Sequence, residues 1–379
     1  MVEFWARDDV QRLDLPSNLY LWKNDGQAIA TLTGHEGAVY GAIELKDGRI
    51  LSWSQDGTLR LWGNDGQAMA TLAGPLGPIY GAIYGALELK DGRILSWSRD
   101  KTLRLWSSSG QAIKSLEGHT GAVRGALELK DGRILSWSDD GTSRLWSSSG
   151  QAIKSLEGHT GAVRSALELK DGRILSWSED GTLRLWESNG QLIEIVTKYN
   201  KGVFGALELR NGSLLSWSGS ILRLREYDGR ELEFGGGIGQ INGLIELNDG
   251  RILSWSDENT LRLWEGNDTI LIGHTNQING AIELKDGQLL SWSDDNTLRL
   301  WSGEGELKAI FIAQANGSLE LKDNRILSWS NNGAMHFWYT NFSNYIVYAC
   351  KHIFRDFTAD ERQFYGITDT TPTCDHFGP

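Results

Sequence analysis

The tetrapeptide Leu-Ser-Trp-Ser occurs eight times in the chain, at nearly constant spacing. Its tryptophans are separated by 44, 40, 40, 40, 38, 37 and 37 residues and are Trp53, Trp97, Trp137, Trp177, Trp217, Trp255, Trp292 and Trp329. A period of this length indicates one supersecondary unit copied in series. A residue that recurs in every copy is typical of a scaffold, so the repeat argues against a unique catalytic group inside it.

Each copy contains four short stretches with strand character, separated by turn residues. In the copy that spans 35–62, apolar and polar residues alternate over 39–45, and two further stretches cover 50–54 and 59–62. Glycines end the Lys-Asp-Gly and Gln-Asp-Gly segments between them, because tight turns need a positive φ. A fourth strand is expected over 67–72. Four antiparallel strands per copy predict one blade of a β-propeller.

The alternation sorts the residues of one blade onto two faces, and neighbouring blades are expected to bury both. The odd-numbered face carries Val39, Ile43, Leu45, Leu51, Trp53, Leu59 and Leu61, and the even-numbered face carries Tyr40, Ala42, Glu44, Ile50, Ser52, Arg60 and Trp62. An equivalent of Glu44 recurs in all eight copies, and an equivalent of Arg60 in seven, with His336 in the eighth. Since buried polar groups need partners, we expect the glutamate and the arginine to form a charge-assisted pair.

The strands make eight complete blades only if the two ends of the array share one blade. Eight copies contain the first three strands, but the eighth lacks a fourth. The fourth strands begin near Gln67, Gln111, Gln151, Gln191, Arg230, Asp268 and Glu306. Residues 27–32 have the sequence of the missing strand, so we expect an all-β, eight-bladed ring closed by this N-terminal strand. The alternative is a seven-bladed ring with a leftover repeat.

Charge and composition argue against several classes of partner. The net charge is −12, so the chain lacks the excess of lysine and arginine that binds nucleic acid or an anionic membrane. We expect no signal peptide and no membrane span, because no apolar run of suitable length occurs. Cys350 and Cys374 are too few for a disulfide framework and lack metal-site spacing, so free thiols are expected. These features predict a monomeric, cytoplasmic protein without a cofactor or metal.

A pattern of Gly-His, then Ser-x-x-x-Asp-Gly, then Leu-x-Leu-Trp runs through several copies. It resembles the repeats of WD40 propellers, in which a His, a Ser, an Asp and a Trp of one repeat form a hydrogen-bonded structural tetrad. The resemblance implies four tetrads: His35, Ser52, Asp56 and Trp62; His119, Ser136, Asp140 and Trp146; His159, Ser176, Asp180 and Trp186; His274, Ser291, Asp295 and Trp301. Four such copies argue against a hydrolase, since a nucleophile needs a unique oxyanion site.

Other copies depart from the WD40 pattern. The second has Pro75 in place of the histidine and a duplicated Tyr-Gly-Ala segment within 80–87, which accounts for its longer step. The fifth lacks the histidine and the Asp-Gly turn and ends in Arg225, and the sixth and eighth lack the histidine. Trp53 and its equivalents stand where the family has a small residue, so the inner packing must differ from the common form.

The limits of the repeat array divide the chain into three expected parts. They are an N-terminal segment with a partial repeat (1–26), the propeller (27–340) and a C-terminal extension (341–379). Residues 18–22 resemble a ninth third strand, which either packs outside the ring or marks the chain as part of a longer array. The extension, with two expected helices, is similar to segments that follow WD propellers in bacterial multidomain signalling and sensor proteins, which implies a bacterial source.

The copies differ at the position four residues before each recurring glutamate. These residues enter the innermost strands near the top mouth of the ring, and they are Tyr40, Tyr84, Arg124, Arg164, Phe204, Asn242, Asn279 and Asn316, with Tyr80 in the insertion. Tyrosine and arginine are enriched at interface hot spots. Acidic pairs stand nearby, at Asp139-Asp140, Glu179-Asp180, Asp257-Glu258 and Asp294-Asp295. The pattern predicts a scaffold or sensor that binds a protein or peptide, with a basic partner on the side of blades 3 and 4.

Three alternatives stay open from the sequence. In the first, the variable residues at the mouth have no role other than to fill space between blades. A propeller that binds a small molecule or a glycan would show repeated equivalent pockets. A quinone-dependent dehydrogenase also repeats tryptophans over eight blades, but its longer repeats and its calcium-binding acidic side chains have no counterpart that we can place in this sequence.

Overall fold

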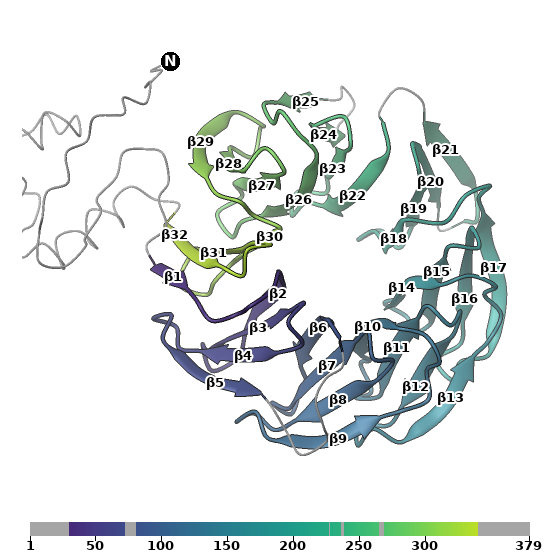
Figure 1. Ribbon diagram of the computed structural model, residues 1–379. Coiled ribbons are helices and arrows are strands. Elements are labelled where there is room, and N and C mark those ends of the chain that lie inside the picture. Colours follow the sequence, from purple (N-terminus) through teal and green to yellow (C-terminus); the bar gives the residue numbers. More distant parts are fainter. Residues whose placement is uncertain (1–29, 73–80, 227, 236–238, 265–268, 340–379) are drawn as a thin grey trace, which may run out of the picture.

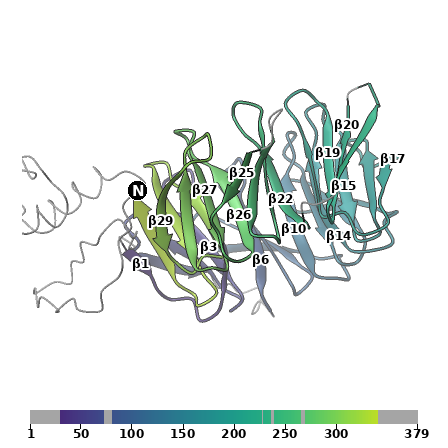
Figure 2. The ribbon, with the colours of Figure 1, turned by 90° about the horizontal axis from the view of Figure 1, so that it is seen from above.

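The computed structural model describes residues 30–72, 81–226, 228–235, 239–264 and 269–339. These residues form eight antiparallel sheets of four strands each. Figures 1 and 2 show the sheets side by side around a common centre, each as one blade. The expected eight-bladed, all-β propeller is confirmed, and the seven-bladed alternative is wrong.

Several expectations fall on residues outside the described part of the chain. They concern the segment 1–26 with its strand-like residues 18–22, the helical extension over 341–379, both cysteines, and Tyr80 in the insertion of the second copy. They stay predictions.

Within blades 1 to 7 the strands follow one another in sequence order from the innermost to the outermost. Blades 1 and 2 consist of β2 (Val39–Glu44), β3 (Ile50–Ser54), β4 (Leu59–Trp62) and β5 (Ala68–Leu72), then β6 (Ile83–Glu88), β7 (Ile94–Ser98), β8 (Leu103–Trp106) and β9 (Ala112–Leu116). Blades 3 and 4 consist of β10 (Val123–Glu128), β11 (Ile134–Ser138), β12 (Ser143–Trp146) and β13 (Ala152–Leu156), then β14 (Val163–Glu168), β15 (Ile174–Ser178), β16 (Thr182–Trp186) and β17 (Leu192–Lys198).

The remaining blades have the same order. Blades 5 and 6 consist of β18 (Gly205–Glu208), β19 (Leu214–Ser218), β20 (Ile221–Arg225) and β21 (Glu231–Gly235), then β22 (Ile241–Glu246), β23 (Ile252–Ser256), β24 (Thr260–Trp264) and β25 (Thr269–Ile272). Blade 7 consists of β26 (Ile278–Glu283), β27 (Leu289–Ser293), β28 (Thr297–Trp301) and β29 (Leu307–Ile312), and blade 8 contains β30 (Gly317–Glu320), β31 (Arg325–Trp329) and β32 (Met335–Tyr339).

The N-terminal strand β1 (Ala30–Leu32) supplies the outer strand of blade 8. It pairs antiparallel with β32, where Leu32 lies opposite Met335 (Figure 1). The Leu32 side chain is 1% exposed and belongs to an apolar cluster with Met335 and Phe337. The expected closure of the ring by the N-terminal strand is therefore confirmed, and it joins segments about 300 residues apart along the chain.

The inner strand of most blades contains a β-bulge that the alternation pattern did not predict. Val39 pairs with Ser54 and Gly41 pairs with Trp53, so Tyr40 is the extra residue. The bulge puts Val39 on the even-numbered face with Ala42, where both contact blade 8. The assignment of Val39 to the odd-numbered face was wrong, and the same bulge leaves Tyr40 exposed at the end of the strand.

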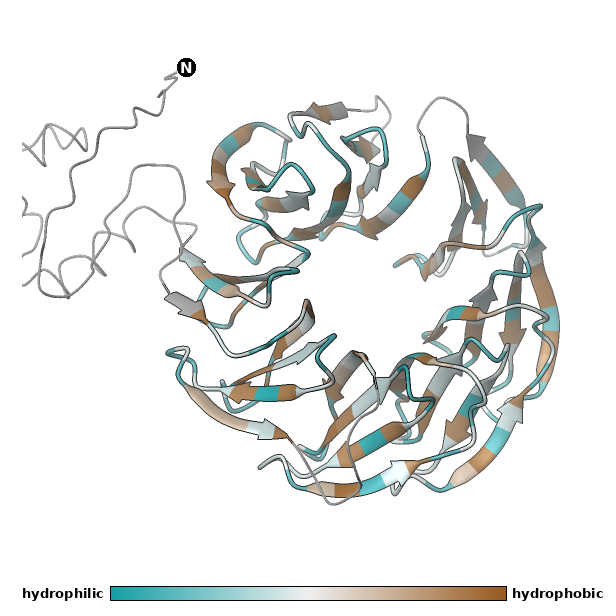
Figure 3. Ribbon diagram, in the orientation of Figure 1, coloured by the Kyte–Doolittle hydropathy of each residue, from teal (hydrophilic) through white to brown (hydrophobic). Residues whose placement is uncertain are grey.

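Neighbouring blades bury their facing surfaces against each other. Leu51 and Leu59, from the odd-numbered face of blade 1, are fully buried in one cluster with Ile94 and Trp106 of blade 2. Equivalent clusters lie between the other blades. Figure 3 shows apolar residues concentrated along the strands and hydrophilic residues at the turns. The core is thus a series of layers between blades, and apolar burial within these layers stabilises the ring.

Each Leu-Ser-Trp-Ser tryptophan lies across the inner strand of its own blade. An added Cβ at Gly41 would lie 2.2 Å from Cζ2 of Trp53, so the ring occupies the space of the missing side chain. Seven of the eight copies have a glycine at this position, and the fourth has Ser165. A tryptophan on the second strand and a glycine on the first therefore form a cross-strand pair, which explains how this chain tolerates a bulky residue there.

The predicted pair between Glu44 and Arg60 is wrong. Glu44 lies at the end of β2 opposite Ile50, and its carboxylate accepts the backbone N–H of Lys322 from blade 8 at 2.6 Å. The ammonium of Lys322 donates to the carbonyls of Leu45 and Lys46. Arg60 lies opposite Ser52, nearer the other end of the blade. The glutamate is thus a contact between blades rather than within one.

This contact repeats around the whole ring. In every blade the recurring glutamate accepts a backbone N–H from the first turn of the preceding blade, at 2.6 to 2.9 Å. The eight donor and acceptor residues are Lys46 and Glu88, Lys90 and Glu128, Lys130 and Glu168, Lys170 and Glu208, Arg210 and Glu246, Asn248 and Glu283, Lys285 and Glu320, and Lys322 and Glu44. The glutamates therefore form a belt that links successive blades at one face of the ring.

Candidate functional site

The four expected Ser, His, Asp and Trp sets come together in the structure. In blade 3, His119 Nδ1 lies 2.8 Å from Asp140 Oδ2, and His119 Nε2 lies 2.8 Å from Ser136 Oγ. Trp146 Nε1 donates to the same Ser136 Oγ at 2.9 Å. Because a carboxylate only accepts, Nδ1 carries the imidazole proton and Nε2 accepts from the serine hydroxyl. Both nitrogens of the histidine are thus engaged within the scaffold.

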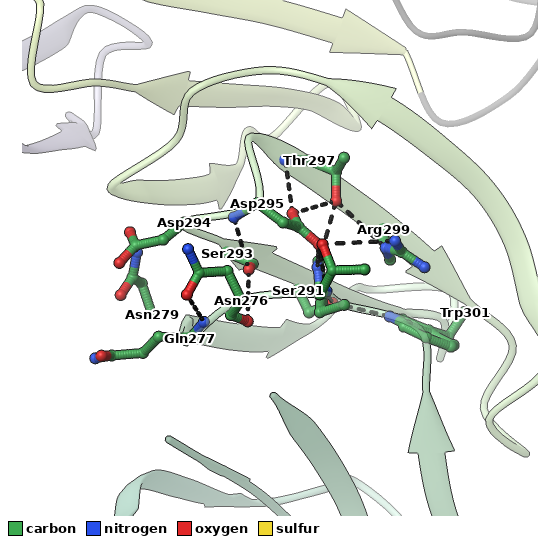
Figure 4. Close-up of polar contacts among 12 residues, drawn as sticks. Asn276, Gln277, Asn279, Ser291, Ser293, Asp294, Asp295, Thr297, Arg299 and Trp301 are labelled. Atoms are coloured by element: carbon green, nitrogen blue, oxygen red, sulfur yellow. Dashed lines mark hydrogen bonds and ion pairs between the residues drawn. The ribbon is translucent and has the colours of Figure 1, made fainter. Parts of the chain in front are cut away.

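The other three tetrads have the same geometry. Their His Nδ1 to Asp distances are 2.8 to 3.0 Å, and their His Nε2 to Ser distances are 2.7 to 2.9 Å. Figure 4 shows the tetrad of blade 7, in which Trp301 donates to Ser291 and Thr297 donates to Asp295. The histidines are buried in all four. A nucleophilic role would need an open substrate position beside the serine, and these serines are fully buried.

The recurring arginine lies beside the tetrad rather than beside the glutamate. Arg184 Nε donates to Thr182 Oγ1 at 3.1 Å, and Arg299 does the same to Thr297. In blade 2, whose sequence has no histidine at this place, Arg104 forms an ion pair with Asp100 at 3.2 Å. In blades 4 and 7 the arginine therefore packs near the acidic end of the tetrad, and in blade 2 it packs against the equivalent aspartate.

Blade 5 contains a substitute that the sequence interpretation missed. The hydroxyl of Tyr199 lies 2.8 Å from Ser216 Oγ, where the four tetrads place the histidine. Tyr199 is 17 residues before its serine, which is also the spacing between His159 and Ser176. Burial raises the pKa of Tyr199 to about 12, so the phenol stays protonated. The constant spacing was the signal that could have identified this residue.

Burial and hydrogen bonding perturb the titration of the tetrads. Burial lowers the pKa of His159 below its usual 6.5, although Asp180 opposes the shift. Burial alone would raise the pKa of Asp180, but hydrogen bonds from Thr182 and Thr160 and the nearby histidine hold that pKa at about 2. At neutral pH the aspartate is therefore charged and the histidine is neutral.

We expect the free energy of unfolding to decrease as the pH falls below about 6.5. Burial lowers the pKa values of His35, His159, His274 and His336, so the unfolded chain binds these protons first. A second loss follows below about pH 3.9, where the unfolded aspartates take up protons before Asp180 does. The measurement is the urea midpoint at about pH 7.5 and about pH 5.5 for the unaltered chain and for His159→Asn. The variant should show a smaller difference between the two midpoints, and an equal difference would contradict the assignment.

The variable residues at the mouth form two stacks over five consecutive blades. The rings of Tyr40 and Tyr84 are 6.2 Å apart, and the guanidinium of Arg124 lies 5.0 Å from the centre of the Tyr84 ring. The guanidinium of Arg164 lies 4.8 Å from the centre of the Phe204 ring. Aromatic and cation–π contacts of this length are attractive. The mouth side chains of blades 1 to 3, and those of blades 4 and 5, therefore contact one another.

Both arginines also meet an acidic residue of their own blade, 15 positions later. Arg124 donates from Nε and Nη2 to the two oxygens of Asp139, each at 2.7 Å. Arg164 makes a single contact of 3.3 Å between Nη2 and Oε1 of Glu179. Asp139 and Glu179, which are two of the acidic residues that motivated the expectation of a basic partner, thus already have cationic partners within the chain.

Amide side chains occupy the mouth position in blades 6 to 8. Asn279 Nδ2 donates to Asp294 Oδ1 at 2.6 Å, as Figure 4 shows, and Asn316 donates to Asn331. The 15-residue offset is the same as in blades 3 and 4. Asn242 of blade 6 is partly buried, and its Nδ2 has no hydrogen-bond partner among the described residues. The mouth therefore has an aromatic and cationic side and an amide side.

The described residues offer no alternative centre for metal chemistry. Within these ranges, no group of three or more His, Cys, Asp or Glu side chains is arranged to hold a metal ion. The same part of the chain contains no helix that is long and apolar enough to cross a membrane.

Comparison with known families found one matching model, described as "WD domain, G-beta repeat". It matches residues 26–63, 110–147, 150–187 and 268–302. Each of these stretches contains one complete tetrad with its histidine. The copies that depart from the tetrad pattern in sequence are those that the model does not match. A comparison with curated proteins found no match.

Solved structures share the fold at low sequence identity. The chain is similar to the computationally designed Ika8 protein, with a TM-score of 0.72 and 23% identity over 83% of this chain and 100% of that one. It is also similar to the WD40 β-propeller domain of Doa1, with a TM-score of 0.57 and 22% identity over 84% of this chain and 98% of that one. At this identity the likeness concerns the fold alone.

Proposed function

This chain carries WD40 repeats in an eight-bladed propeller, and we propose that it is a non-catalytic module that binds a protein or peptide at the mouth of the ring. WD40 propellers are typically scaffolds for protein interactions, which supports this class of function. The belt glutamates and the tetrads are engaged in holding the blades and their turns. The mouth, where the copies differ in sequence, is then the surface that recognises the protein or peptide.

The observation that carries the proposal is the composition of the mouth on blades 1 to 5. Tyr40 is 39% exposed, and the Arg124 and Arg164 side chains are 46% and 37% exposed. Tyr84 packs against Arg124, and Phe204 packs against Arg164. Tyrosine and arginine provide large contact areas at low entropic cost and dominate many interfaces. Contacts among these side chains also hold them in place before a ligand binds, which lowers the cost of ordering them.

The tetrads support a function without catalysis. Each imidazole has both nitrogens hydrogen bonded, and each serine is fully buried, so neither group is available to a substrate. The near-identity of four tetrads on one ring also fits a common structural role.

The proposal is tested by affinity purification of partners with the unaltered chain, Tyr84→Ala and Arg230→Ala. Arg230 lies on a peripheral turn of blade 5 and pairs with Glu226, so its variant is the control. A partner that binds through the mouth should be retained by the control and reduced about tenfold or more by Tyr84→Ala. Purified partner and chain then give the affinity directly. Equal recovery of every partner with Tyr84→Ala would place the binding surface elsewhere.

A further inference from the structure

Blades 3 and 4 are nearly identical in sequence, and one of their differences falls at the mouth. Residues 107–146 and 147–186 differ at three pairs of positions, which are Gly125 and Ser165, Asp139 and Glu179, and Ser143 and Leu183. The second difference changes the acidic partner of the mouth arginine. The two blades therefore offer an internal comparison of how an aspartate and a glutamate hold the same guanidinium.

Arg164 makes fewer and longer contacts with its acidic partner than Arg124 does. Asp139 accepts two hydrogen bonds of 2.7 Å from Arg124 in a bidentate arrangement. Glu179 makes one contact of 3.3 Å with Arg164, which is longer than a usual charge-assisted hydrogen bond. A guanidinium has five N–H donors in a fixed plane. Arg164 therefore keeps more of its donor capacity for an incoming group than Arg124 does.

The neighbouring loop of blade 5 adds positive charge to this place. Residues 199–203 pack on the turn that carries Glu179, since the backbone N–H of Val203 donates to Ser178 at 2.9 Å and that of Tyr199 to Gly181 at 2.8 Å. This loop carries the exposed Lys201. The corresponding turn of blade 5 carries no acidic residue, because Gly219 and Ser220 stand at the positions equivalent to Glu179 and Asp180. The loop thus brings an exposed lysine next to the turn that carries Glu179, the partner of Arg164.

An aromatic surface adjoins the cations. The plane of Phe204 supports the Arg164 guanidinium at 4.8 Å, and the backbone N–H of Phe204 donates to Trp217, which fixes the start of the inner strand. Stacking leaves the edge of a guanidinium available for planar acceptors. Arg164, Lys201 and Phe204, which we name the Arg164 sector, therefore combine donors that suit a carboxylate with an apolar surface beside them.

We propose that the Arg164 sector binds a carboxylate of an acidic peptide. This inference rests on the proposed function and reverses the expectation of a basic partner on this side of the ring. The carboxylate enters at the edge of the Arg164 guanidinium and replaces or shares the contact with Glu179. Its source is an Asp or Glu side chain or the C-terminus of the peptide, since both present the same pair of oxygens.

The test uses a library of octapeptides of random composition, immobilised through their amino ends and made with free and amidated C-termini. Peptides that bind the unaltered chain should be enriched in Asp and Glu in the amidated set if side chains supply the carboxylate. A preference confined to the free set identifies the C-terminus. For a bound acidic peptide, exchange of its acidic residue for the amide should weaken binding by about tenfold or more.

Two variants test whether the preference for acidic peptides depends on the Arg164 sector. Arg164→Met should abolish the acidic preference, and Glu179→Asp should weaken it, because the shorter carboxylate copies the bidentate arrangement of Asp139 and engages Arg164. Arg230→Ala is the control and should leave the preference unchanged. Circular dichroism checks that each variant is folded.

The possible failures are distinguishable. Peptides that bind with neutral or basic preference, or whose acidic preference survives Arg164→Met, overturn the inference even if Tyr84→Ala still reduces binding, and the proposed function then stands alone. A chain that binds no peptide in the library, and whose partners are all indifferent to Tyr84→Ala, contradicts both.

Discussion

Replacement of Leu32 by aspartate is expected to lower the free energy of unfolding by about 5 kcal/mol. Leu32 is 1% exposed and packs against Met335 and Phe337 at the place where the two ends of the array share a blade. The substitution removes a buried aliphatic side chain and leaves a carboxylate without a partner in an apolar cluster. Because β1 is the strand that completes blade 8, its loss also exposes the edge of β32.

Urea denaturation followed by tryptophan fluorescence measures this change, and limited proteolysis reports whether the ends of the ring open first. The matched control is Met69→Asp, which places the same charge on the outer strand of blade 1 at a residue that is 58% exposed. The control should stay within about 0.5 kcal/mol of the unaltered chain. Similar small effects for both variants would mean that closure by β1 contributes little to stability.

The second large effect is expected for Ser136→Ala, at about 3 kcal/mol. Ser136 Oγ accepts from Trp146 Nε1 at 2.9 Å and bonds His119 Nε2 at 2.8 Å, and all three groups are buried. Removal of the hydroxyl leaves an indole N–H and an imidazole nitrogen unpaired where water cannot replace the lost bonds. Thermal or urea unfolding measures the loss.

Two other positions provide comparisons for Ser136. Ser96 of blade 2 accepts from Trp106 at 2.9 Å, and its copy has no histidine, so Ser96→Ala should cost about half as much. Ser143 is 1% exposed with a hydroxyl that has no hydrogen-bond partner among the described residues, while its equivalent Leu183 packs in the apolar core. Ser143→Leu should therefore stabilise the chain by about 1–2 kcal/mol. A loss for Ser96→Ala as large as that for Ser136→Ala would contradict the role of the histidine.

Local patterns predicted the fold well because each blade is built from short strands and tight turns. The boundaries of β3 and β4 match the alternation in the sequence, and the fourth strands begin one residue after the positions expected for them. The tetrads followed from the resemblance to WD40 repeats, because the family pattern assigns the four residues of each copy to one hydrogen-bonded set. The inner strand was the exception, because a bulge at Tyr40 shifts the alternation and leaves no separate mark in the sequence.

Contacts between blades could not be read from these patterns. Glu44 and Arg60 recur together and lie on one face, which suggested a pair, but the carboxylate meets a backbone N–H of blade 8 that is 278 residues away in the chain. The pairs of Arg124 with Asp139 and of Asn279 with Asp294, which lie within one blade, were not recognised from the sequence either. Their common 15-residue offset became recognisable only with the geometry.

The sequence by itself determined the repeated unit, the number of blades and the closing strand, because period and turn chemistry act over a few residues within each copy. The residues of the tetrads came from the resemblance of the repeat to the WD40 pattern. Only the tertiary structure decided what the recurring glutamates bind, that Tyr199 takes the place of a histidine, and how far each mouth arginine is engaged. These contacts depend on the distances and orientations of side chains from different segments. The period brings the segments near each other but does not set how their side chains point. A difference of one methylene between Asp139 and Glu179 changes two bonds of 2.7 Å into one contact of 3.3 Å, and that change appears only when the side chains are placed in space.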